Sequence, residues 1–239
     1  MLNVFAPANK DGRKRPVMVW LHGGGFASGS GSGRILDGTS LAHAHDVVVV
    51  TLNHRLNVFG YTYLGEAMGS DFAPSSSVGL LDIVAALEWV RDNIAGLGGD
   101  PNLVTIFGQS GGGRKVATLM AMPAAQGLFH RAVIESGAVL RLTTHDDAVK
   151  QAGLLLAELR LTKGQVRELQ NVPLERLLAA DHTRIQKRLS MIGRRRRSWH
   201  STTPGCRRAR PSALAEIRHA SSRRSRAPIP THRRGICGF

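Results

Sequence analysis

Short apolar runs alternate with helix-like segments along the first 140 residues of the chain. Several of the runs are rich in β-branched residues and apolar throughout, which is typical of strands covered on both faces. They are Leu2–Ala6, Val17–Leu21, Val47–Leu52, Leu103–Phe107 and Arg131–Ser136. Strands that alternate with helices in this way predict an α/β fold with a mainly parallel sheet and crossover helices.

One amphipathic helix is predicted between the third and fourth runs, over Val78–Ala95. Serines precede it, Gly96 follows it, and its apolar residues recur every three or four positions. The apolar residues are Leu80, Ile83, Val84, Leu87, Val90 and Ile94. We then expect Gly98–Pro101 to form a turn into the next strand.

Residues 139–189 also have helical spacing, in three successive segments over 145–161, 162–172 and 173–189. The first segment carries a group of leucines that is predicted to belong to a core, although these residues could instead line a substrate pocket. They are Leu154, Leu155, Leu156, Leu159 and Leu161.

Charge divides the chain near residue 190. Residues 1–189 hold 19 basic and 16 acidic residues, whereas residues 190–239 hold 13 arginines, no lysine and one acid, Glu216. The net charge of +15 therefore arises mainly from the last 50 residues. We expect residues 1–189 to form one partial domain and residues 190–239 to be an Arg-rich, disordered tail without a packed core.

A serine flanked by glycines follows the fourth apolar run, in the sequence IFGQSGGG. Ser110 is placed after a strand and before a helix that begins near Gly111, which is the context of a nucleophile elbow. Gly108 and Gly112 suit such a turn because a Cβ at either position would clash with the neighbouring strand. We therefore predict that Ser110 is a catalytic nucleophile, with a Gly-rich turn as the alternative.

A second glycine-rich segment, HGGGF, follows the strand Val17–Leu21. Its N–H groups are free of side chains just beyond the end of a strand. Acyl transfer needs such donors directed at the developing oxyanion, and the N–H of Gly111 would be another. A flexible Gly/Ser loop is the alternative, since glycines and serines continue as far as Gly33.

Together these segments resemble the type-B carboxylesterase family, the cholinesterase-like branch of the α/β-hydrolase fold. The likeness covers residues 1–185 and is strongest over 16–138. It rests on LNVFAP, PVMVWLHGGGF, VVVVTLNHRLNVFGY, LLDIVAALEWVRDNIAGLGGDPNLVTIFGQSGGG and MPAAQGLFHRAVIESGA.

The resemblance implies an α/β-hydrolase fold, with helices on both faces of a mainly parallel sheet, incomplete at both ends. It implies a serine carboxylesterase with Ser110 as nucleophile and Gly24, Gly25 and Gly111 as oxyanion donors. The substrate would be a small carboxylic ester, with no metal and no cofactor. Residues 139–189 resemble the helical excursion that covers the active-site gorge in this family.

The sequence departs from the family pattern at the elbow and at its ends. Gln109 stands where Glu is commonest, and Gly111 where alanine is usual. Arg114 and Lys115 place two cations early in the elbow helix, where the helix dipole disfavours them, and we expect them to be hard to reconcile with a buried site. A leading segment and a long C-terminal half are expected to be missing.

The triad acid, usually Glu, and the triad histidine lie well after the serine in this family, and no family motif surrounds the histidines that follow residue 190. These are His200, His219 and His232. Earlier in the chain, His22 is interpreted as a packing or loop-orienting residue, while His43 and His45 lack a third ligand for a metal. We therefore expect that the chain does not encode the proton acceptor and is inactive as it stands.

The composition of residues 190–239 suggests why the family motifs around the triad acid and histidine are missing. Arg, Ser, Pro, Cys and Trp without Lys are what a GC-rich gene gives in the wrong reading frame, and we hypothesise frame disruptions near residues 190 and 220. A nucleic-acid-binding arm is the less favoured alternative, because arginine runs attract phosphate by charge alone. A non-catalytic binding module of the cholinesterase-like type also stays open.

No signal peptide or run of 18 apolar residues is visible, so a cytoplasmic location is the default, without a membrane.

Overall fold

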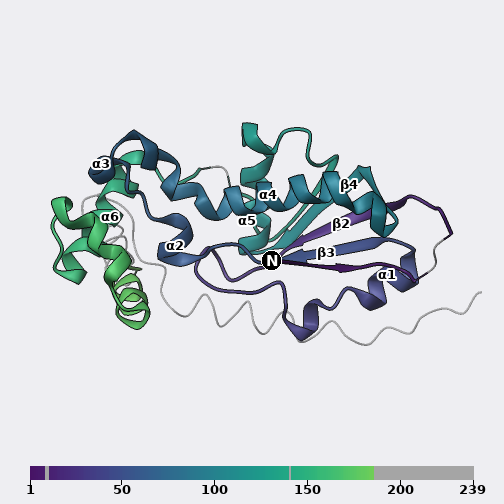
Figure 1. Ribbon diagram of the computed structural model, residues 1–239, viewed down its shortest axis with the longest axis horizontal. Coiled ribbons are helices and arrows are strands. Elements are labelled where there is room, and N and C mark those ends of the chain that lie inside the picture. The colour runs from purple at the N-terminus through teal and green to yellow at the C-terminus, as the bar shows by residue number, and fades with distance from the viewer. Residues whose placement is uncertain (9–10, 140, 186–239) are drawn as a thin grey trace, which may run out of the picture. The chain divides into compact units, whose positions relative to one another are not determined.

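A five-stranded sheet forms the centre of the computed structural model, which describes residues 1–8, 11–139 and 141–185 (Figure 1). The strand order is β1-β3-β2-β4-β5, with β1 antiparallel to β3 and the other neighbours parallel. The strands are β1 (Leu2–Phe5), β2 (Arg15–Leu21), β3 (Val48–Leu52), β4 (Gly99–Gln109) and β5 (Arg131–Glu135). The predicted mainly parallel sheet is therefore confirmed.

Helices lie on both faces of this sheet, as predicted. On one face, apolar side chains of the central strands pack against α4 (Val78–Asn93) and α5 (Gly111–Met120) in the main core. On the other face, Met18 and Val49 pack in a smaller cluster with Ala42 of α1 (Thr39–His45). The alternation Val17, Met18, Val19 along β2 thus divides its side chains between two cores.

The remaining elements are short and lie mostly in the connections. They are η1 (Arg34–Leu36), α2 (Asn57–Tyr61), α3 (Gly65–Met68), η2 (Ser70–Ser77), η3 (Ile94–Leu97) and η4 (Pro123–Ala125). With η2 and η3 at its two ends, α4 is part of a continuous helical stretch, Ser70–Leu97, that is long and apolar enough by composition to cross a membrane. The apolar residues predicted for α4 are buried in the main core, and core helices pass the same test of composition.

The expected turn at Gly98–Pro101 is only partly correct. Gly98 does adopt a left-handed conformation, with φ +82°, but β4 already begins at Gly99. Arg15 pairs with Gly99 and its N–H donates to the Gly98 carbonyl, while Val17 pairs with Val104, so the residues between form an irregular bulge. Pairing with β2 therefore extends the strand beyond its apolar run.

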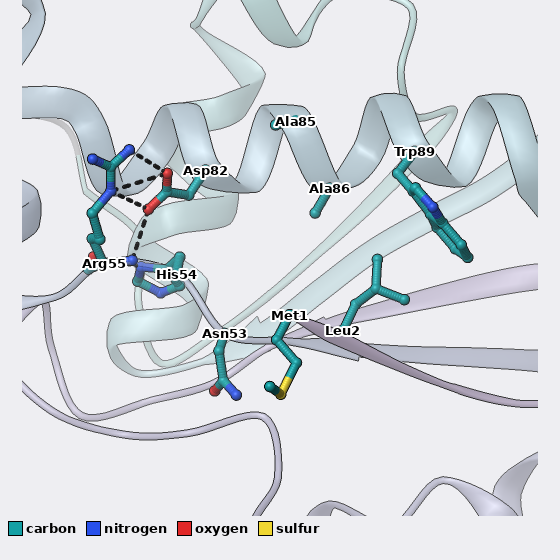
Figure 2. Close-up of a pocket in the computed structure, with 9 residues that line it drawn as sticks. All are labelled: Met1, Leu2, Asn53, His54, Arg55, Asp82, Ala85, Ala86 and Trp89. Carbon is teal, nitrogen blue, oxygen red and sulfur yellow. Dashed lines mark hydrogen bonds and ion pairs between the residues drawn. The ribbon is translucent and has the colours of Figure 1, made fainter.

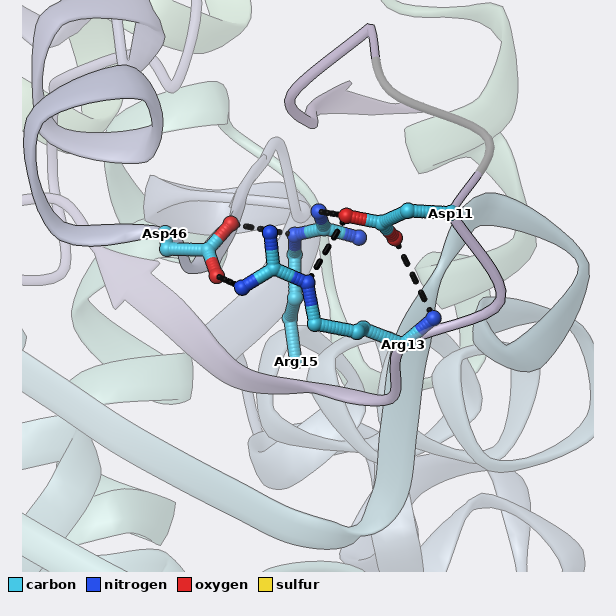
Figure 3. Close-up of polar contacts among 4 residues, drawn as sticks. All are labelled: Asp11, Arg13, Arg15 and Asp46. Atoms are coloured by element: carbon cyan, nitrogen blue, oxygen red, sulfur yellow. Dashed lines mark hydrogen bonds and ion pairs between the residues drawn. The ribbon is translucent and has the colours of Figure 1, made fainter.

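Arg15 is almost fully buried at the start of β2, and its ion pairs connect β2 to Asp11, in the loop before the strand, and to Asp46, after α1 (Figure 3). Its Nε donates to Asp46 at 2.6 Å and its terminal nitrogen donates to Asp11 at 2.7 Å. Arg13 bonds the same two carboxylates from the exposed side. These bonds favour the charged form of Asp11 and hold the pKa of its carboxyl well below the usual range. Two carboxylates thus compensate for the burial of one guanidinium.

The predicted helical region after residue 139 is present as α6 (His145–Leu159), η5 (Lys163–Asn171) and a helix over residues 174–185. Leu155, Leu156 and Leu159 are buried, and Leu155 and Leu159 form a cluster with Val58 of α2, so the core prediction is confirmed for these three. The other two predicted leucines, Leu154 and Leu161, are half-buried, and Leu161 packs against that cluster. The segment 162–172 is a 3-10 helix with a Thr162–Gln165 capping box. The predictions for residues 190–239 lie outside the described residues.

Candidate active site

Ser110 occupies the turn between β4 and α5, where the sequence places it. Its backbone has φ +55° and ψ −116°, a strained conformation for a residue with a side chain. Its N–H donates to the Glu135 carbonyl at 2.8 Å, and its carbonyl accepts from Arg114 at 3.1 Å. The side chain is exposed, so the strained turn presents a hydroxyl to solvent at the carboxyl end of a central strand.

Glycines on both sides of Ser110 allow the elbow to lie against β2. A Cβ at Gly108 would be 2.6 Å from the Leu21 carbonyl oxygen. A Cβ at Gly112 would overlap that same oxygen and lie 2.9 Å from the Leu21 carbonyl carbon. The close approach of backbone to backbone is therefore the reason that the motif needs glycine here, as the sequence predicted.

The loop Gly23–Gly25, which follows β2, faces the serine. Gly24 and Gly25 have φ values of +86° and +66°, and the Gly24 carbonyl accepts from Ala27 and Ser28 in a tight turn. A Cβ on Gly23 would be 4.0 Å from the Ser110 Cβ. Among the described residues, no hydrogen bond is recorded from the N–H groups of Gly24 and Gly25.

Gly111 brings the elbow and this loop together. A Cβ at Gly111 would overlap the backbone of Gly25, including its nitrogen. As the first residue of α5, Gly111 also has an N–H without a partner inside the helix. The structure therefore brings the four predicted site residues, Ser110, Gly24, Gly25 and Gly111, into one place.

Two stacked histidines lie beneath the loop. The rings of His22 and His54 are 4.9 Å apart and nearly parallel, and both side chains are buried. His22 Nδ1 donates to the Gly23 carbonyl at 2.8 Å, and His54 Nδ1 donates to the Arg55 carbonyl at 2.9 Å. Burial lowers the pKa of His22 and lowers that of His54 to about 4, so both are neutral near pH 7. The contact to Gly23 supports the loop-orienting interpretation of His22.

The burial of Lys115 was not predicted from the sequence. Arg114 is exposed, but Lys115 is fully buried on α5, and its ammonium donates to the His22 carbonyl at 2.9 Å. The expectation that a cation here conflicts with a buried site is thus wrong for Lys115, because a backbone carbonyl accepts from it. Its spacing from Gly111, Gly112 and Leu119 on one helix face was the available signal for its burial.

None of the described histidines forms a hydrogen bond with the Ser110 hydroxyl. His43 and His45 are exposed on α1, and His130 Nδ1 accepts from the Val104 N–H at 3.2 Å. His145 contacts Tyr63 at 3.2 Å. The later candidates, His200, His219 and His232, lie outside the described residues.

Two hollows of the described region lie away from Ser110. One, of about 670 Å³, lies between the β1 and β3 ends and α4 (Figure 2). At one end of it, Arg55 forms an ion pair with Asp82, and Trp89 of α4 lines the other end. The other, of about 360 Å³, lies between α2 and the helical region after α6 and is mostly apolar. Ser110 lines neither hollow.

Comparisons with known proteins agree with this architecture. The model of the carboxylesterase family matches residues 1–201. Para-nitrobenzyl esterase of Bacillus subtilis is 47% identical over 188 residues, which are 78% of this chain and 37% of the relative. Human carboxylesterase 3 is 48% identical over 140 residues, which are 58% of this chain and 23% of the relative. The chain thus spans well under half the length of these relatives.

Solved structures extend the comparison to the fold. Juvenile hormone esterase from Manduca sexta, with OTFP covalently attached, is 34% identical, with a TM-score of 0.68. The match covers 76% of this chain and 35% of that one. A thermophilic PNB esterase is 47% identical with a TM-score of 0.73, covering 78% of this chain and 38% of that one. These neighbours confirm the predicted α/β-hydrolase fold for the matched part.

Proposed function

The chain belongs to the carboxylesterase family, and from that premise we propose that it carries the nucleophile and the oxyanion hole of a serine ester hydrolase. The family supports hydrolysis of carboxylic esters as the reaction. Ser110 is the proposed nucleophile, and the N–H groups of Gly24, Gly25 and Gly111 are the proposed oxyanion donors.

In the proposed reaction, the Ser110 oxygen attacks the ester carbonyl carbon and its proton passes to a general base. The negative charge that develops on the carbonyl oxygen accepts hydrogen bonds from the three glycine N–H groups. Collapse of this intermediate releases the alcohol, which takes up the proton, and leaves an acyl group on Ser110. Water then attacks the acyl-enzyme, releases the carboxylic acid and restores the hydroxyl.

The observation that carries the proposal is the contact between the elbow and the glycine loop. Ser110 has a positive φ and an exposed side chain, and the backbone of Gly111 lies directly against Gly25. A simple Gly-rich turn has no need to hold a strained serine beside N–H groups that have no hydrogen-bond partner among the described residues. Strain of this kind is commonly concentrated at functional sites.

The general base is the part of the mechanism that the described residues do not provide. The buried Nε2 atoms of His22 and His54 have no partner in the described region and no access to solvent. We therefore propose that residues 1–239 alone hydrolyse esters slowly. A triad enzyme without its base and acid keeps only the contribution of substrate binding and of the oxyanion hole.

Covalent labelling tests the nucleophile without requiring turnover. An organophosphonate probe should label the 239-residue chain slowly, because an unactivated serine is a weak nucleophile. Ser110→Ala should abolish the labelling, whereas the matched control Ser70→Ala, at an exposed serine in η2, should leave it unchanged. The site is read by mass spectrometry of the labelled peptide.

Equal labelling of wild type and Ser110→Ala would refute the assignment of the nucleophile. A chain that folds and is not labelled would favour the alternative of a non-catalytic binding module. A p-nitrophenyl or p-nitrobenzyl acyl ester is a suitable first substrate, because a relative named para-nitrobenzyl esterase is 47% identical.

A further inference from the structure

Lys115 is a buried cation that contacts both ends of the proposed oxyanion loop. The residue is fully buried, and its ammonium donates to the carbonyl of His22, which precedes the loop, at 2.9 Å. The same nitrogen lies 5.8 Å from the ring centroid of Phe26, which follows the loop. A single side chain from the elbow helix therefore spans the three glycines between these residues.

The surroundings of Lys115 offer little compensation for its charge. Among the described residues, no carboxylate forms an ion pair with it, and the His22 carbonyl is its recorded hydrogen-bond acceptor. The charge of Lys115 helps to lower the pKa values of two buried histidines, His22 and His54. Burial lowers the pKa of Lys115 itself to about 8, so below that pH the fold contains a cation that is poorly solvated.

A residue that served only to stabilise the fold would be better apolar at this position. Apolar replacements of buried charged groups are often neutral or stabilising, because burial removes the water that solvates the charge. Neighbouring buried positions on α5, such as Val116 and Leu119, are apolar. A buried cation on the same helix face as Gly111, Gly112 and Leu119 therefore points to a task at the loop.

We propose that Lys115 is a positioning residue that fixes the oxyanion loop against the elbow, and this inference rests on the proposed function. Its ammonium holds the His22 carbonyl, and its contact with the Phe26 ring restrains the other end of the loop. Between these anchors Gly24 and Gly25 have positive φ, and Gly25 packs against Gly111. Without the anchors, three glycines in sequence would leave the donor N–H groups free to move.

The main test combines Lys115→Met with the labelling of Ser110 in the full chain. Methionine has a similar length and lacks the charge and the donor. Loss of one oxyanion donor typically lowers rates by about 10²-fold to 10³-fold, so we expect the maximal labelling rate to fall by about 10²-fold. The probe concentration at half-maximal rate should change little, because the loop acts on the transition state.

Val116→Ala is the matched control on the same helix. Val116 is fully buried in the main core, so its truncation should lower the melting temperature while leaving the labelling rate of the folded protein within about 3-fold. Lys115→Met should show the opposite pattern, with a melting temperature no lower than that of wild type and slow labelling. Equal losses of labelling rate in the two variants would overturn the positioning role, and so would a folded Lys115→Met that is labelled at the wild-type rate.

Hydrogen exchange provides a readout that does not depend on catalysis. In Lys115→Met, the backbone amides of residues 22–28 should exchange faster, while those of β4 should not change. Unchanged exchange of residues 22–28 would overturn the anchoring, whatever the labelling shows. Faster exchange in a protein whose Ser110 is not labelled even in wild type would support the anchoring and refute the proposed function.

Lys115→Gln provides a second test of the positioning role if Lys115→Met does not fold. Lys115→Gln removes the charge and keeps an amide donor on a shorter side chain. We expect it to fold, to show faster exchange over residues 22–28, and to be labelled more slowly than wild type. Wild-type exchange and labelling in a folded Lys115→Gln would overturn the proposal.

Discussion

Replacing Gly112 by alanine should destabilise the fold and impair the elbow, although alanine is normally the better helix former. The added Cβ would overlap the Leu21 carbonyl oxygen and lie 2.9 Å from the carbonyl carbon. These atoms belong to the end of β2, which pairs with strands on both sides. Neither the helix nor the strand can move away freely, and overpacking of this kind costs about 1–3 kcal/mol.

Gly153→Ala is the matched control, because it makes the same change in a helix without steric conflict. Gly153 is exposed in α6, and a Cβ there has no atom within 4 Å. Removing a helical glycine should raise the free energy of unfolding by about 0.5–1 kcal/mol. The two substitutions should therefore differ in sign.

Urea unfolding followed by circular dichroism at 222 nm measures both variants. With a slope of about 2 kcal/mol per molar urea, Gly112→Ala should shift the midpoint down by about 1 M and Gly153→Ala should shift it up by a few tenths. Labelling of Ser110 should also be slower in Gly112→Ala. The end of β2 continues directly into the glycine loop, so displacing Leu21 should also displace the proposed oxyanion donors. A midpoint for Gly112→Ala at or above the wild-type value, with normal labelling, would refute this packing argument.

Two further predictions concern pH and turnover. Because burial lowers the folded-state pKa of His54 to about 4, the unfolded chain binds the proton more tightly, and stability should fall as the pH falls from about 6.5 to 4, by up to about 3 kcal/mol. His54→Gln should flatten the pH dependence of the urea midpoint, and an identical slope in both proteins would contradict the assignment. Hydrolysis of a p-nitrophenyl acyl ester by the 239-residue chain should be slower by about 10⁴-fold to 10⁶-fold than that of a complete triad enzyme. Fast hydrolysis that requires Ser110 would contradict this and would call for single substitutions of His200, His219 and His232.

The central strands were predictable because their apolar runs are buried in the sheet, whereas the edge strands β1 and β5 have no fully buried residue. The predicted run Val17–Leu21 lies within β2, and Val47–Leu52 agrees with β3 within one residue. The start of β4 was not predictable in the same way, since Gly99 and Pro101 carry turn signals in the sequence. Hydrogen bonding between Arg15 and Gly98 extends the pairing there, and this contact joins residues that are far apart in sequence.

In the candidate site too, features set by local geometry could be predicted, whereas features set by contacts between distant residues could not. Ser110 and its flanking glycines could be found because a strained turn and a close backbone contact restrict the allowed residue types locally. The burial of Lys115 depends instead on the His22 carbonyl, which lies 93 residues earlier in the chain. The charge of Arg114 and Lys115 predicted that both would be exposed. They differ in their position around α5, because only Lys115 lies on its buried face. Lys115 shares its helix face with Gly111 and Gly112, which lie against Gly25 and Leu21, so this face of α5 has room for the glycine loop and carries the donor that reaches the His22 carbonyl.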